Sequence, residues 1–182
     1  GSFIPGNNPA TVFDEGTGIL IPKGHKLSLQ FHYVTNGLAT TDETSIGLYF
    51  YDEPPERELL TKAVSPRFVI EPYDSNHAME ASYEFDKPVV VTSVRARMNF
   101  RGKKMRFAVE TAAGTMRDVL SIPAYNYGWQ PHYHLSEAVE LAAGDRIHVR
   151  GAFDNSYSNP FNPDPSEEVT FGLESYDEMF TG

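Results

Sequence analysis

The sequence predicts an all-β protein, an antiparallel β-sandwich or jelly roll of about eight or nine strands. Two observations lead to this prediction. Short runs of alternating apolar and polar residues recur along the chain, and clusters of turn-forming residues separate them. No window of about a dozen residues keeps the period of an amphipathic helix.

The first clear run spans residues 27–33, where Leu27, Leu29, Phe31 and Tyr33 alternate with polar residues and therefore share one face of a strand. Further strands are expected at 45–51, 67–70, 79–85, 89–100, 105–110, 116–122, 146–153 and 169–174. Glycine, proline and asparagine punctuate the gaps, as at Asn36-Gly37 and Ala143-Gly144. The proline-rich stretch 154–165 is expected to be an ordered loop.

Composition excludes several classes of protein. The 182 residues suit a single domain, which we expect to span 3–182 because Gly1 and Ser2 are typical of a cloning scar. No apolar run approaches the ~20 residues of a membrane-spanning helix. The absence of cysteine excludes a disulfide scaffold and a cysteine nucleophile. A net charge of −10 disfavours nucleic acid as a partner.

The most informative strand lies at 93–103. Alternation from Val94 to Phe100 directs the apolar residues to the core, so that the opposite face carries Arg95, Arg97, Asn99 and Arg101. Acidic residues on neighbouring strands would pair with these arginines. Alternatively, Arg95, Arg97 and Arg101 form a face that binds a carboxylate ligand or an acidic partner.

Four ordered motifs carry a resemblance to a known family. They are Arg-Met-Asn-Phe-Arg-Gly-Lys at 97–103, Pro-Ala-Tyr-Asn-Tyr-Gly-Trp-Gln at 123–130, the loop at 153–164, and Tyr-Asp-Glu-Met at 176–179. Together they resemble the C-terminal domain of copper type II, ascorbate-dependent monooxygenases, in particular bacterial relatives of peptidylglycine hydroxylating monooxygenase and dopamine β-monooxygenase. The resemblance covers nearly the whole chain.

The resemblance implies a jelly-roll domain that carries the copper at which dioxygen is activated. In the family, two histidines two residues apart and a methionine bind this copper, while a preceding domain supplies an electron. Met179 matches the methionine, but the histidine positions fall on Arg97 and Asn99. Arginine has no lone pair to donate, and asparagine offers a hard oxygen, so we expect no cofactor here.

The resemblance therefore implies a non-catalytic binding or structural module of a larger exported protein, periplasmic or extracellular. Its partner would be a preceding domain of the same polypeptide or an acidic ligand. One alternative is an active copper monooxygenase with an altered site, in which His132 or His134 joins Met179. His132 and His134 are two residues apart and would share one strand face, although the simpler expectation is two solvent-facing side chains.

A further alternative is a glycan- or calcium-binding sandwich. Exposed aromatic residues bind sugars in such domains, and the chain offers Tyr125, Tyr127, Trp129 and Tyr133. The 154–168 loop is rich in the oxygen atoms that calcium prefers. Its spacing does not match an EF-hand, and turn formation accounts for the same residues.

Overall fold

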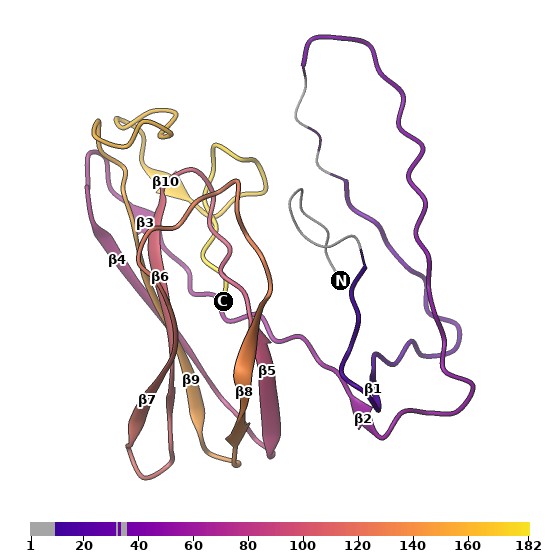
Figure 1. Ribbon diagram of the computed structural model, residues 1–182. Helices are drawn as coiled ribbons and strands as arrows, with labels where there is room; N and C mark the ends of the chain where they lie inside the picture. The colour runs from indigo at the N-terminus through magenta and orange to yellow at the C-terminus, as the bar shows by residue number, and fades with distance from the viewer. Residues whose placement is uncertain (1–9, 32, 34–35) are drawn as a thin grey trace. The chain divides into compact units, whose positions relative to one another are not determined.

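The computed structural model describes residues 10–31, 33 and 36–182 (Figure 1). Within this part of the chain there are strands and turns but no helix, so the expected all-β class is confirmed. None of the described residues therefore forms a helix with the length and apolar character needed to cross a membrane. The chain divides into two compact units, Thr11–Thr61 and a second that contains Lys62–Gly182.

The unit Lys62–Gly182 contains two larger antiparallel sheets (Figure 1). The four-stranded sheet has the order β4-β9-β6-β7 and consists of His77–Glu84, Arg146–Phe153, Gly102–Glu110 and Met116–Ile122. The two-stranded sheet pairs β5, Val89–Val94, with β8, Tyr133–Leu141. A short antiparallel pair joins β3, Val69–Ile70, to β10, Val169–Thr170.

One hydrophobic core holds these sheets together. Period-two alternation directs Phe107 of β6 and Val149 of β9 inward, and Val139 of β8 packs into the same cluster from the smaller sheet. Both larger sheets thus share one core, which is the arrangement of a β-sandwich.

The last residues of the chain complete this core. Gly182 and Val64 exchange backbone hydrogen bonds, both 3.0 Å long, and Phe180 is fully buried. The Phe180 ring lies against Gly151 of β9, where a Cβ atom would come within 2.7 Å of the ring. It also meets the Phe153 ring edge to face, with centroids 6.0 Å apart.

The unit Thr11–Thr61 differs from the prediction. It contains one short parallel pair, β1 at Thr17–Gly18 with β2 at Arg57–Glu58. The strands expected at 27–33 and 45–51 are wrong for the described residues, and residue 32 lies outside them. Alternation alone does not make a strand, because the backbone also needs a hydrogen-bonding neighbour. The apolar side chains of both runs are exposed, as Leu27 at 60% and Phe50 at 76% illustrate.

In the unit Lys62–Gly182 most expected strands are present with shifted ends. The run expected at 89–100 ends as β5 at Val94, and the run expected at 169–174 is only two residues long in β10. The prediction omits β8 altogether. These differences matter for the site, because β8 and the chain that follows β5 both contribute to it.

Replacing Phe180 by alanine should reduce the free energy of unfolding by about 3–5 kcal/mol, since a fully buried aromatic ring leaves a cavity. Urea denaturation followed by the fluorescence of Trp129, the single tryptophan, measures this loss. The matched control is Phe161→Ala, where the side chain is 70% exposed and the change should stay within about 0.5 kcal/mol. Equal losses in the two variants would contradict this description of the core.

Candidate functional site

The chain that follows β5 lies antiparallel to the C-terminal segment. Arg97 donates its backbone N–H to the carbonyl of Thr181 at 2.8 Å, and Thr181 donates back to Arg97 at 3.0 Å. The backbone pairing stops there, but the N–H groups of Asn99 and Met179 both donate to the same oxygen, Glu178 Oε2, at 2.8 and 3.3 Å. The structure therefore brings together the three positions that the family resemblance singles out.

Asn99 and Met179 are buried, whereas Arg97 is exposed. The Asn99 side-chain nitrogen Nδ2 donates to two backbone carbonyls, those of Glu174 at 3.0 Å and Asp177 at 3.1 Å. Because carbonyl oxygens only accept, this pair of bonds fixes which end of the amide is nitrogen. The Asn99 side chain therefore anchors the loop at 174–177.

These three side chains do not fit a copper ion. The Arg97 guanidinium carries a positive charge and has no free electron pair, and the Nδ2 atom of Asn99 is a hydrogen-bond donor. Only the Met179 thioether remains as a soft ligand. Within the described residues there is also no group of three or more His, Cys, Asp or Glu side chains placed to hold a metal.

Glu178 is a fully buried carboxylate beside the segment 97–101. It accepts hydrogen bonds from the backbone N–H groups of Arg101 at 2.6 Å, Asn99 at 2.8 Å and Met179 at 3.3 Å. Burial raises the pKa of Glu178 from 4.5 to about 7, and these N–H groups oppose the rise. The carboxylate therefore holds the segment 97–101 and the C-terminal segment together.

Arg101 is the second buried charge, and only 2% of it is exposed. Its guanidinium donates from Nε to Asn155 Oδ1 at 2.9 Å, from Nη1 to the Tyr176 carbonyl at 2.7 Å, and from Nη2 to the Asp164 carbonyl at 3.3 Å. The expectation that Arg101 shares an open face with Arg95 and Arg97 is therefore wrong. Residues 99–102 form a turn, closed by Gly102 N–H to Asn99 O, and this turn ends the alternation.

The loop at 154–168 uses its polar side chains for its own structure. Asn155 is fully buried and donates from Nδ2 to the carbonyls of Glu71 and Glu167 at 3.0 and 2.9 Å. Asp154 accepts hydrogen bonds from Ser156, and Asp164 accepts them from Ser166. The Arg101 guanidinium supplies the positive charge for this loop, so these contacts favour turn formation over a calcium site.

His132 and His134 lie where β8 begins, and both are exposed. His134 pairs with Ser93 across the two-stranded sheet, and Tyr133 between the two histidines packs toward the core. The two imidazoles therefore share the outer face, as their spacing predicts. Partial burial lowers the pKa of His132, and the charges of Arg95 and His134 lower it further.

The aromatic residues at 125–133 serve mainly as framework. The Tyr125 hydroxyl donates to the Met98 carbonyl at 2.6 Å and accepts from the Met98 N–H at 2.9 Å. Tyr127 packs on Phe100 with ring centroids 4.6 Å apart. Trp129 is 56% exposed, and no flat platform of several rings suited to a sugar is built from this group.

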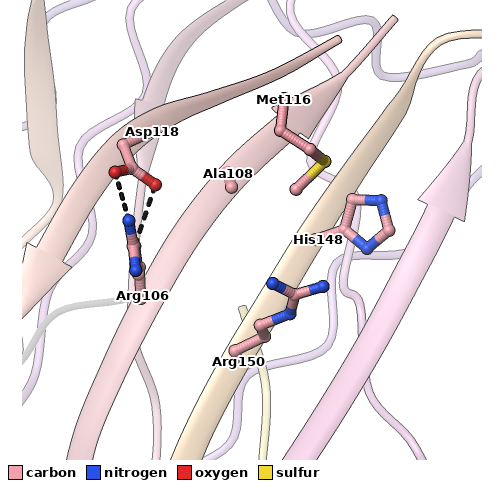
Figure 2. Close-up of a pocket in the computed structure, with 6 residues that line it drawn as sticks. All are labelled: Arg106, Ala108, Met116, Asp118, His148 and Arg150. Carbon is pink, nitrogen blue, oxygen red and sulfur yellow. Dashed lines mark hydrogen bonds and ion pairs between the residues drawn. The ribbon is translucent and has the colours of Figure 1, made fainter. Parts of the chain in front are cut away.

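A shallow pocket lies on the outer face of the four-stranded sheet (Figure 2). Figure 2 shows Arg106 bound to Asp118 beside Ala108, with His148 and Arg150 on the neighbouring strand β9. Arg150 forms an ion pair with Glu80 at 3.0 Å. The Nε2 atom of His148 lies 2.8 Å from a Glu110 oxygen, and its Nδ1 lies 3.3 Å from Glu80. The sequence predicts His148 as a surface or hydrogen-bonded residue on the polar face of its strand, and the contacts with Glu110 and Glu80 agree with this prediction.

No protein-family model matches the chain, and no curated protein matches it. The resemblance to copper type II monooxygenases therefore depends on the motifs in the sequence alone.

Replacing Arg101 by lysine should lower the free energy of unfolding by about 3 kcal/mol, because an ammonium group cannot reproduce the three directed bonds of a buried guanidinium. The control is Arg106→Lys, which alters an exposed ion pair and should cost less than about 1 kcal/mol. Chemical denaturation of both variants decides the matter, and equal effects would show that the buried network contributes little.

Stability should depend on pH through Glu178. Its folded pKa of about 7 lies above its ordinary 4.5, so the folded state binds the extra proton and stability falls as pH rises from about 5 to about 8. The shift corresponds to about 3 kcal/mol at most. Glu178→Gln removes this contribution, so the difference between the wild-type and variant stability curves should change across that range. Parallel curves would mean that the pKa of Glu178 is not raised.

Proposed function

We propose that this chain is a domain of the copper type II monooxygenase C-terminal type that has lost its copper site and serves as a non-catalytic binding or structural module. Three findings support the proposal. The motifs resemble that family in order, the chain is all-β, and the segment 97–99 lies against Met179.

The proposal depends most on the hydrogen bonds that the Asn99 side chain forms. In a metal site the side chain at this position must direct a lone pair toward the ion. Here it directs its two N–H groups to the Glu174 and Asp177 carbonyls and so fixes the C-terminal loop. Arg97, two residues earlier, presents a cation that repels Cu⁺ and Cu²⁺ alike. The position has a structural role in place of a catalytic one.

The active alternative, with His132 or His134 joined to Met179, has less support. Both imidazoles face outward from β8, whereas Met179 is 7% exposed within the C-terminal segment. Arg95 also places a positive charge near His132. A copper ion at this pair would therefore have to overcome a neighbouring cation.

The proposal also covers the location of the protein and its partners. By the family resemblance alone, we place the module in an exported protein, periplasmic or extracellular, beside a preceding domain of the same polypeptide. An acidic ligand is the other partner that we propose, because Arg95 and Arg97 place two positive charges near each other.

The wild-type protein should not bind Cu(I) more tightly than about 1 μM, and the double variant Arg97→His, Asn99→His should gain affinity, since two imidazoles would then lie in the segment that adjoins Met179. Competitive titration with a Cu(I) chelator measures both. Adding Met179→Leu to the double variant is the control and should abolish the gain. Circular dichroism establishes that each variant is folded, and Arg97→His alone tests the exposed position if the double variant unfolds.

Tight stoichiometric Cu(I) binding by the wild-type protein would contradict the proposal. A folded double variant without any gain would show that Asn99 and Met179 do not occupy the family's ligand positions.

A further inference from the structure

Basic side chains gather on one face where β5 ends and β8 begins. Ser93 pairs with His134 and Val94 with Tyr133, so continuing this register brings Arg95 beside His132. Val94, Ala96 and Met98 are buried behind this face. The intervening Arg95 and Arg97 therefore share the side that carries the two histidines. We call Arg95, Arg97, His132 and His134 the basic face.

The dimensions of the basic face suit one compact anion. Residues two apart on an extended chain lie ~6.6 Å apart. Directly opposed residues of an antiparallel pair have Cβ atoms about 5 Å apart. Arg97 is exposed, and its planar guanidinium can bind two oxygen atoms of a phosphate or carboxylate at once. In this register His132 lies diagonally across from Arg97 and can donate an N–H to the same ligand, whereas His134, opposite Ser93, lies ~13 Å from Arg97 along the strand direction.

Within the described part of the chain, no carboxylate forms an ion pair with Arg97, the exposed arginine of the basic face. Among the described residues, Arg97, His132 and His134 form no ion pair, although the chain contains 25 acidic residues. Burial followed by the charge of Arg97 lowers the pKa of Arg95, so like charges oppose one another here. An anion bound among them would relieve this repulsion.

The arginines of the pocket in Figure 2 provide a useful contrast. Arg106 is paired with Asp118, and Arg150 is paired with Glu80. An incoming anion would have to displace a carboxylate from either arginine. At Arg97 no such competition arises from the described residues, so the basic face is the better candidate.

We propose that the basic face binds a compact, multiply charged oxyanion, either a phosphate group or a small di- or tricarboxylate. This proposal goes beyond the loss of copper chemistry and does not depend on it, because no metal takes part. It replaces the three-arginine face expected from the sequence, since Arg101 is buried and the two histidines take its place.

Isothermal titration calorimetry with inorganic phosphate and, separately, with citrate tests the proposal at pH 7 and about 0.15 M salt. We expect saturable one-site binding of at least one of the two anions. Which anion binds more tightly distinguishes a phosphate ligand from a carboxylate ligand. Arg97→Gln should weaken binding at least about tenfold, because a charge-assisted bidentate contact is lost.

The matched control is Arg117→Gln, which removes the same charge from an exposed arginine on β7 and should change the dissociation constant less than about twofold. His132→Gln should weaken binding and His134→Gln should weaken it less, because His134 lies farther from Arg97; both side chains are exposed, so neither change should unfold the protein. The proposal is overturned if neither anion binds the wild type at up to about 10 mM, or if Arg117→Gln weakens binding as much as Arg97→Gln.

Discussion

Arg101 and Glu178 place opposite charges in the interior, and the surrounding loops stabilise them mainly through the backbone. The Arg101 guanidinium donates hydrogen bonds to the carbonyls of Tyr176 and Asp164, while three backbone N–H groups donate to the Glu178 carboxylate. A charge removed from water without such partners would cost several kcal/mol. Because these bonds come from the turn at 99–102, the loop at 154–168 and the segment at 174–179, the two charges determine how those three pieces meet.

The sequence predicts the fold class and the strands that lie in the four-stranded sheet, because there the local alternation coincides with a hydrogen-bonded neighbour. It does not predict β8, since Glu137 interrupts an apolar series that continues to Val139 and Leu141. The opposite error occurs in the unit Thr11–Thr61, where the runs at 27–33 and 45–51 alternate well but have no strand to pair with among the described residues. Pairing is non-local, and alternation carries no information about it.

The same limit applies to the candidate site. The motifs single out Arg97, Asn99 and Met179, but they do not predict that Arg101 is buried. Its burial depends on the turn at 99–102, which interrupts the alternating pattern and for which Gly102 is the local signal. The position of His132 beside Arg95 required the register of β5 with β8, which no local pattern contains. Hydrogen bonds of Asn99, Glu178 and Arg101 anchor the neighbouring loops, and these bonds link residues far apart in the sequence.

The pairing of Val64 with Gly182 has a kinetic consequence. It joins the two ends of the unit Lys62–Gly182, and Phe180 enters the core from the same terminal segment. A contact between residues so distant in sequence has a large loop-closure entropy, which places such topologies among the slower folders. During synthesis the core would stay open on one side until residues 180–182 leave the ribosome, so that Phe153 and its neighbours would be exposed to other chains for that interval.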